Sequence, residues 1–257
     1  MNDPLLEWPN HLWLIRHGES AGNVARDRAH AAGIPRIDIS ERDVDVPLSP
    51  RGTEQSQALG EWFAKADSHE RPDVIWVSPY RRAIATAQII RDLCAAGTEP
   101  LPLVVDERLR EKEFGILDRL TRQGIQQFHP EQAEIRKHLG KFYHRPPGGE
   151  SWCDVILRLR SALHTLSLHY AGKRVLVVTH QVVVLCFRYL LENLTESELL
   201  TIDSQGDVAN CSVTDYVCSN VPRTENALLL RQYNWVAALR EAGAPLTSQP
   251  DPEPVNP

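Results

Sequence analysis

An arginine and a histidine stand together at the end of a short apolar run near the start of the chain. The run 12–15 is wholly apolar, and Arg16-His17-Gly18 follows at once, with Asn23 six residues beyond the histidine. Arginine can donate two parallel hydrogen bonds to phosphate or carboxylate oxygens. Glycine lets the backbone approach a ligand closely, and asparagine adds an amide hydrogen-bond donor. A lone histidine is more often an ordinary half-buried residue, but these neighbours indicate an anion beside His17.

Two later junctions between a predicted strand and a predicted helix carry the same kinds of side chain. The apolar run 175–178 is followed by Thr-His-Gln, which places His180 at its end, and Ser-Pro-Tyr-Arg-Arg over 78–82 follows another apolar run. Isolated surface arginines are common, but two in the first turn of a helix oppose the helix dipole. Because ligands bind at the carboxyl edge of open α/β sheets, the junctions predict one pocket that holds His17, His180 and Arg82.

A charged segment after a third apolar run offers two candidate proton donors. The segment 108–115, Arg-Leu-Arg-Glu-Lys-Glu-Phe-Gly, contains Glu111 and Glu113, two residues apart. A charge run of this kind is typical of a solvated face. A protonated carboxylic acid would nevertheless help a poor leaving group to depart, so both glutamates are candidates on pattern alone.

Taken in order, these motifs resemble the histidine phosphatase superfamily, also called the phosphoglycerate mutase-like family. The resemblance rests on Arg-His-Gly-Glu-Ser over 16–20, Arg82 before an alanine, the Leu-x-Glu at Glu111, the Pro-Pro-Gly-Gly-Glu-Ser turn over 146–151 and Asn-Cys-Ser-Val-Thr over 210–214. The motifs run from Arg16 to about Val217 and cover most of the chain. The resemblance implies that His17 is phosphorylated transiently, that Arg82 holds the phosphoryl group, and that Glu111 rather than Glu113 donates the proton. The 146–151 turn is expected to be structural, with Ser151 or Glu150 near the helix N-cap.

The implied catalytic residues are His17, Glu111, His180, Arg16 and Arg82, and the implied substrate-binding residues are Asn23, Gly18, Gln181, Arg16 and Arg82. In this scheme a neutral His17 attacks phosphorus while the arginines and His180 surround the equatorial oxygens. Glu111 protonates the leaving oxygen and later takes a proton from water. The scheme needs no metal or other cofactor, and the sequence contains no HExxH, CxxC or Walker-type loop.

Three functions remain open on this pattern. The favoured one is a phosphomonoesterase that acts on a small phosphorylated metabolite, such as a sugar phosphate. The alternative is a cofactor-dependent phosphoglycerate mutase. The mutase branch of the family usually lacks the Gly-Glu-Ser turn and has paired arginines before the helix. This chain has Gly-Glu-Ser over 149–151 and only Arg-Lys over 136–137, so the mutase is less favoured. A non-catalytic phosphate-binding module is least favoured, because it should have lost at least one of His17, Arg82, Glu111 and His180, and the chain keeps all four.

Within the phosphatases, Thr-His-Gln over 179–181 resembles the fructose-2,6-bisphosphatase module, whose glutamine at this place meets the substrate. Leu185 and Gly148 stand where that module has an arginine and a lysine for the distant phosphate. The basic, aromatic stretch 141–145 is another source of cations, although such a loop is more typical of plain surface. The identity of the metabolite is therefore open.

Composition limits the class of protein. With 257 residues and 42% hydrophobic content, the chain can bury one large core or at most two small ones, and we expect one domain. The formal charge of −6 argues against a nucleic-acid or anionic-membrane surface. The five cysteines show no CxxC pair or zinc spacing, which indicates reduced thiols, and no secretory signal or run of about 20 apolar residues is present. We expect a soluble, cytoplasmic protein without nucleic-acid or membrane partners; the oligomeric state is open.

The elements that must position the pocket alternate between strand and helix. Apolar runs predict strands over 12–15, 73–77, 101–105, 175–178, 212–217 and 227–230. The prolines of the third place it at a sheet edge or mark the start of a strand, and the last two form a hairpin. Helical spacing predicts helices after Gly52 and over 81–93, 121–128, 131–139, 152–166 and 182–191. This alternation predicts an α/β fold: a single-domain three-layer α/β/α sandwich with a mostly parallel central sheet. Residues 106–149 form a small excursion over the active site.

The remaining segments are polar. Residues 24–46, with alternating charges over 38–45, are typical of a solvated loop that could also fold over the site as a lid. We expect residues 1–242 to form the one domain, opened by a loose lead-in over 1–9. Residues 243–257 contain five prolines and are expected to be a disordered Pro-rich tail.

Overall fold

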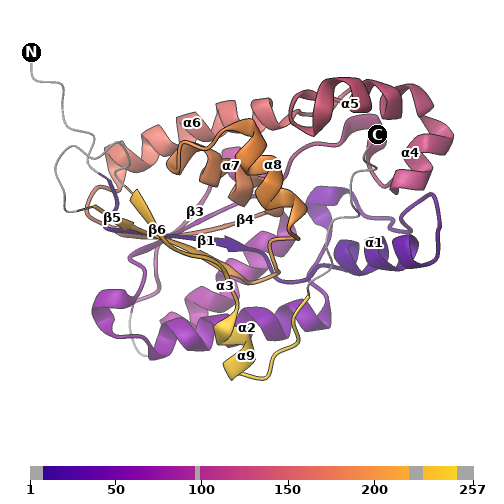
Figure 1. Ribbon diagram of the computed structural model, residues 1–257. Helices are drawn as coiled ribbons and strands as arrows, with labels where there is room; N and C mark the ends of the chain where they lie inside the picture. Colours follow the sequence, from indigo (N-terminus) through magenta and orange to yellow (C-terminus); the bar gives the residue numbers. More distant parts are fainter. Residues whose placement is uncertain (1–7, 96–98, 220–227, 248–257) are drawn as a thin grey trace, which may run out of the picture.

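The computed structural model describes residues 8–95, 99–219 and 228–247. Within these residues, six strands form one sheet in the order β3-β2-β4-β1-β5-β6 (Figure 1). The strands are β1 (His11–Arg16), β2 (Val74–Val77), β3 (Leu103–Val105), β4 (Arg174–Thr179), β5 (Val213–Cys218) and β6 (Leu228–Trp235). The strands β1 to β4 are parallel, β5 pairs antiparallel with β1, and β6 pairs antiparallel with β5. The sheet is therefore mostly parallel, as the sequence predicts.

Helices cover both faces of the sheet (Figure 1). They are α1 (Ala21–Ala31), α2 (Pro50–Lys65), α3 (Arg81–Cys94), α4 (Arg122–Phe128), α5 (Pro130–Tyr143), α6 (Trp152–His169), α7 (Gln181–Leu191), α8 (Glu196–Ser204) and α9 (Ala237–Glu241). Side chains alternate along a strand, so in β1 Leu12 and Leu14 pack with α6 and α7, whereas Trp13 and Ile15 pack with α2 and α3. The predicted three-layer α/β/α architecture is confirmed.

The positions of the outer strands also match the sequence. The strand β3 lies at one edge of the sheet, and β5 and β6 form the antiparallel pair at the other edge. Residue 227, the predicted start of the last strand, lies outside the described residues. Pro100 and Pro102, which cannot donate to a ladder, lie just before β3, so the observed strand agrees with both expected places, a sheet edge and a strand start.

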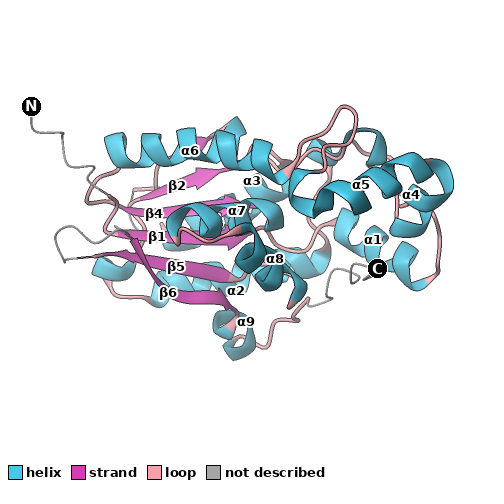
Figure 2. Cartoon of the chain, turned by 45° about the horizontal axis from the view of Figure 1, so that its top comes forward, coloured by secondary structure: helices cyan, strands magenta, loops and turns pink. Residues whose placement is uncertain are grey.

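The excursion lies beyond the carboxyl edge of the parallel strands. Figure 2 shows α4 and α5 grouped with α1 at this end of the sheet. The predicted helix 131–139 ends where the backbone of α5 breaks, because Gly140 has a φ of 80° that is not helical. The excursion therefore stands next to the edge where the candidate residues converge.

One prediction is corrected: residues 24–46 are not all loop, because α1 occupies Ala21–Ala31. The signal is a capping box in which Ser20 accepts a hydrogen bond from the amide of Asn23, whose side chain accepts one from the amide of Ser20. The helix has one buried residue, Ala29, so it lacks the apolar stripe by which helices are recognised. The helices α8 and α9 are further elements that the sequence analysis does not predict.

Residues 243–247 belong to the predicted disordered tail and are described here. Nε2 of Gln55 in α2 donates to the carbonyl oxygen of Pro245 at 2.8 Å, and the hydroxyl of Thr247 donates to Oδ1 of Asn210 at 2.7 Å. Residues 248–257 lie outside the described residues, as do residues 1–7 of the lead-in. All five cysteines are free thiols. No helix in the described part of the chain is long and apolar enough to cross a membrane.

Candidate active site

Four neighbouring parallel strands end at one edge of the sheet, and each is followed by a residue that the sequence singles out. In strand order these are Glu111 after β3, Arg82 after β2, His180 after β4 and His17 after β1. Arg16 at the end of β1 is paired with Thr179 at the end of β4, so the two histidines leave the sheet side by side. Their rings lie edge to face with 5.0 Å between centroids. The structure thus brings the two predicted histidines together.

The two ring nitrogens of His17 have different partners. Nδ1 donates to the carbonyl oxygen of Gly18 at 2.7 Å, and Nε2 accepts a 3.2 Å hydrogen bond from Nε of Arg82. Burial, followed by the charges of Arg82 and Arg16, lowers the pKa of His17 well below its usual value. The imidazole is therefore neutral near pH 7, with its lone pair on Nε2, which is the state that a nucleophilic histidine needs.

His180 is fully buried and keeps one ring nitrogen for another partner. Its Nε2 lies 2.7 Å from Oγ of Ser78, and this oxygen also accepts a 3.3 Å hydrogen bond from the amide of Tyr80. We assign the Ser78 hydroxyl as the donor to Nε2, and this assignment places the proton of His180 on Nδ1. Among the described residues, Nδ1 has no hydrogen-bond partner. Burial and the charge of Arg82 lower the pKa of His180, so the ring is a neutral donor.

Arg82 lies in the first turn of α3, and its side chain is 6% exposed. Its Nε faces His17, whereas its other two nitrogens bind Asp43 in a short 3₁₀ helix, η1 (Asp43–Asp45). Nη1 donates to the carbonyl oxygen of Asp43 at 2.6 Å and to Oδ1 at 2.9 Å, and Nη2 donates to Oδ2 at 3.3 Å. The guanidinium is thus fixed on both sides.

Arg16 meets a buried carboxylate that also binds Gln181. Nη1 of Arg16 donates to the carbonyl oxygen of Val208 and lies 3.8 Å from Oδ2 of Asp207. Oδ1 of Asp207 accepts a 2.8 Å hydrogen bond from Nε2 of Gln181, and Oδ2 lies 3.5 Å from Nη2 of Arg26. Arg16 and Gln181, both predicted site residues, therefore contact the same carboxylate, that of Asp207.

Glu111 and Glu113 lie in different surroundings. Glu111 is half-buried, and burial raises its pKa. The charge of Asp43 adds to this rise, whereas a hydrogen bond from the next backbone amide and the charge of Arg82 oppose it. Glu113 is exposed, and its carboxylate accepts a 3.0 Å hydrogen bond from the hydroxyl of Tyr80. A carboxyl group with a raised pKa near cationic side chains suits proton donation, so these surroundings favour Glu111.

The Gly-Gly-Glu-Ser turn supports the Glu111 segment. Ser151 is the N-cap of α6 and closes a capping box there. Glu150 accepts a 3.1 Å hydrogen bond from the amide of Glu113 and pairs with Arg158 of α6 at 3.0 Å. Nη2 of Arg158 also donates to the carbonyl oxygen of Glu111 at 3.3 Å. The turn thus has the structural role that the sequence analysis expects.

Gly18 and Asn23, both expected to face a ligand, make contacts within the protein. A Cβ atom at Gly18 would lie 2.4 Å from the carbonyl oxygen of Gly52, and the amide of Gly18 donates to the hydroxyl of Thr86 at 3.0 Å. The close backbone approach at Gly18 is therefore to α2. Oδ1 of Asn23 accepts a 3.0 Å hydrogen bond from the amide of Ser20, which leaves its Nδ2–H to donate. Ligand binding by both residues stays a prediction.

The contact between α2 and the His17 loop gives a stability prediction. A Cβ atom at Gly52 would lie 1.9 Å from the carbonyl oxygen of Glu19, so Gly52→Ala must displace backbone. Overpacking typically costs about 1–3 kcal/mol, and we expect Gly52→Ala to lose about 3 kcal/mol of unfolding free energy in urea. Gly22→Ala is the control, because its nearest atom is a flexible Val46 methyl at 3.3 Å. Equal stability of the two variants would contradict the contact.

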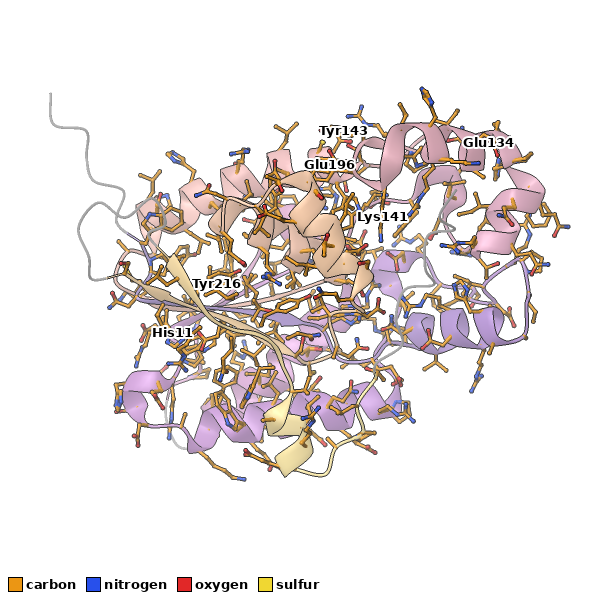
Figure 3. All side chains as sticks on the ribbon, in the orientation of Figure 1. His11, Glu134, Lys141, Tyr143, Glu196 and Tyr216 are labelled. Atoms are coloured by element: carbon orange, nitrogen blue, oxygen red, sulfur yellow. The ribbon has the colours of Figure 1, made fainter. Side chains whose placement is uncertain are left out.

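The basic stretch at the end of α5 is paired with neighbouring carboxylates. Nζ of Lys141 lies 2.5 Å from Oδ2 of Asp203, and Arg145 pairs with a carboxylate of α6. Tyr143 lies beside Glu196 of α8 (Figure 3), and a hydrogen bond with that carboxylate raises the pKa of the tyrosine. Phe142 and His144 of the same stretch are buried, so the stretch is not all plain surface, although plain surface is the interpretation that the sequence analysis favours.

Three polar residues of the site are missed by the sequence analysis. Ser78 stands in the 78–82 junction, where the sequence analysis singles out only Arg82, although Ser78 directly follows a strand as the histidines do. Asp43 belongs to a run of alternating charges, and a charge run gives no indication of which member turns inward. Asp207 follows α8 and is flanked by no motif. These residues bind His180, Arg82 and Arg16 respectively.

A family model described as "Histidine phosphatase superfamily (branch 1)" matches residues 12–225 of the chain. The chain belongs to the histidine phosphatase superfamily. The matched residues include β1 from Leu12 onward, all of β2 to β5 and all the candidate site residues, whereas β6 lies beyond them. The family that the sequence motifs indicate is thereby confirmed.

Individual proteins agree with this assignment. A Schizosaccharomyces pombe protein named "Probable fructose-2,6-bisphosphatase" is 32% identical over 188 residues, which are 73% of this chain and 40% of that protein. The Saccharomyces cerevisiae fructose-2,6-bisphosphatase is 28% identical over 190 residues, 74% of this chain and 36% of that protein. The chain thus spans two fifths or less of the length of these two superfamily relatives. The solved structure of Bacillus stearothermophilus YhfR has a TM-score of 0.68 at 26% identity and covers 89% of this chain and 98% of its own.

Proposed function

We propose that this protein is a phosphomonoesterase that hydrolyses a small phosphorylated metabolite through a phosphohistidine intermediate on His17, without a metal ion. The observation that carries the proposal is the environment of His17. Its Nδ1 proton is held by a backbone carbonyl and its Nε2 lone pair faces the guanidinium of Arg82. A neutral nucleophile is thus paired with a cation placed to receive the anion that it attacks.

In the first half of the reaction, Nε2 of His17 attacks phosphorus in line with the ester oxygen, and the P–O bond breaks as the P–N bond forms. Arg82, Arg16 and the Nδ1–H of His180 stabilise the charge on the equatorial oxygens. The Nδ2–H of Asn23 is a further donor that we assign to the phosphoryl group, and Gln181 is assigned to the substrate beyond it. Gly18 contributes through its carbonyl oxygen, which orients His17.

Glu111 serves both halves of the reaction. Its raised pKa favours the protonated form, which gives its proton to the departing oxygen. In the second half the ionised Glu111 accepts a proton from water as the water attacks phosphorus, the P–N bond breaks, and inorganic phosphate forms. His17 is returned to its neutral state.

The substrate class follows from the relatives and is part of the proposal. The two curated relatives are named for fructose-2,6-bisphosphatase, which makes a phosphorylated sugar the first class to test. The experiment is to assay phosphate release by the purified protein from sugar phosphates, fructose 2,6-bisphosphate, phosphoglycerates and nucleotides. We expect one sugar phosphate to be preferred. Isomerisation of a phosphoglycerate that depends on 2,3-bisphosphoglycerate, without net phosphate release, would instead assign a mutase.

A metal prediction follows from the same scheme. Among the described residues, no three His, Cys, Asp or Glu side chains gather as they would around a metal ion, and the proposed steps are carried by histidine, arginine and glutamate. We expect full phosphatase activity after exhaustive dialysis against EDTA, measured with p-nitrophenyl phosphate. Loss of activity that is restored by one divalent ion would show that a metal takes part.

A further inference from the structure

Arg82 presents two different edges of its guanidinium to two different neighbours. Nη1 and Nη2 form the end edge of the guanidinium, and both donate to the carboxylate of Asp43, at 2.9 Å and 3.3 Å. Nε and Nη2 form the side edge, and Nε points at Nε2 of His17 from 3.2 Å. An arginine can bind one anion through each edge. The edge taken by Asp43 is therefore not the edge that faces the nucleophilic nitrogen.

We infer that Asp43 is a positioning residue for the reaction: by holding the end of the Arg82 guanidinium, it aims the side edge at the phosphoryl group on Nε2 of His17. This inference rests on the proposed function, because it concerns the geometry in which Arg82 meets the transferred group. Asp43 touches no reacting atom in this arrangement. It acts through Arg82, whose long side chain would otherwise have several rotamers to choose from.

The backbone around Asp43 is fixed well enough to serve this purpose. The carbonyl oxygen of Asp43 accepts a 2.6 Å hydrogen bond from Nη1 of Arg82, so both the main chain and the side chain hold the guanidinium. The segment before it is tied to Arg119, whose guanidinium donates to the carbonyl oxygens of Ile39 at 3.0 Å and Glu41 at 2.8 Å. This is the segment that the sequence analysis reads as a solvated loop or lid. The structure shows that one of the alternating charges in this segment, Asp43, binds the Arg82 guanidinium.

The charge of Asp43 also acts on the proposed proton donor. It raises the pKa of Glu111, in the same direction as the larger effect of burial. Arg82 acts in the opposite direction, so a carboxylate on its guanidinium reduces the tendency of the cation to ionise Glu111. The same side chain thereby orients the anion-binding group and helps to keep the acid protonated.

The rival explanation is that Asp43 is an internal anion that the phosphoryl group must displace. The two explanations predict opposite signs. If Asp43 competes with substrate, removing its charge raises kcat/KM and tightens inhibition by inorganic phosphate. If Asp43 positions Arg82, the same change slows phosphorylation of His17 and leaves phosphate inhibition unchanged or weaker.

The test uses Asp43→Asn and Asp43→Ala in the full chain, with p-nitrophenyl phosphate as substrate and inorganic phosphate as inhibitor. The measured quantities are the burst rate of nitrophenol, kcat, KM and the inhibition constant of phosphate. We expect the burst rate to fall by about 10- to 100-fold in both variants, because small misplacements of a positioning group have effects of this size. The fall should appear in kcat more than in KM.

Asp45→Asn is the matched control, because Asp45 lies in the same short helix but pairs with the exposed Arg42. It should behave as the wild-type protein. Thermal melts identify any variant that unfolds, and Asp43, with a side chain 41% exposed, tolerates substitution better than a core residue. Faster turnover or tighter phosphate inhibition in the Asp43 variants, or kinetics equal to the control, would overturn the inference. If the wild-type protein itself releases no phosphate from p-nitrophenyl phosphate or from any phosphorylated metabolite, the proposed function fails, and this inference fails with it.

Discussion

His17→Ala is expected to abolish phosphate release from every substrate while leaving the protein folded. The substitution removes the atom that forms the P–N bond, and loss of a nucleophile costs at least about 10³-fold in kcat. The side chain makes its two hydrogen bonds to a backbone carbonyl and to Arg82, so the apolar packing on both faces of the sheet is not disturbed. The measurement is phosphate release from the best substrate and from p-nitrophenyl phosphate, with circular dichroism to verify the fold.

His164→Ala serves as the histidine control, because His164 is exposed on α6. Its turnover should equal that of the wild-type protein. Turnover at the wild-type rate in folded His17→Ala protein would contradict the mechanism.

Glu111→Gln is expected to slow alkyl phosphates far more than aryl phosphates. Loss of general acid assistance costs about 10²- to 10⁴-fold when the leaving alkoxide is poor, and much less when the leaving phenolate is already stable. The comparison must be made on the burst of leaving group, because dephosphorylation still needs a base and will slow steady-state turnover for both. Rapid-quench assays of a sugar phosphate and of p-nitrophenyl phosphate provide the two burst rates.

Glu113→Gln is the matched variant, two residues away on the same segment. It should retain both burst rates, since its carboxylate is exposed and accepts a hydrogen bond from Tyr80. Equal slowing of both substrates by Glu111→Gln, or a selective effect in Glu113→Gln, would show that the proton donor is misassigned.

The strands and the polar residues at their ends could be predicted from the sequence. A buried parallel strand is a short, continuous apolar run, so an arginine or histidine directly after such a run is placed by the chain itself. His17 and His180 both follow such a run, and the register of β1 with β4 sets them side by side. Local sequence therefore predicts that each histidine stands at the end of a strand, whereas the pairing of the two strands brings the histidines together.

Contacts between distant segments could not be predicted in the same way. Asp43 and Arg82 are separated by α2 and β2, and no periodicity in the segment 24–46 shows which of its acids turns toward the site. The helix α1 was missed for a related reason, since its capping box is a local signal but its polar surface gives no apolar stripe. Spacing alone leaves both Glu111 and Glu113 as candidates; the family motif chooses Glu111, and the physical difference between the two, burial, depends on tertiary packing.

Trapping the phosphorylated enzyme tests the central claim most directly. Glu111→Gln protein is mixed with p-nitrophenyl phosphate, quenched in alkali within the burst, digested and examined by mass spectrometry. The phosphoryl group should reside on the peptide that contains His17, be lost in acid, and be absent from His17→Ala protein treated in the same way. A phosphoryl group on any other residue, or a full burst of nitrophenol with no phosphorylated peptide, would contradict a phosphohistidine intermediate on His17.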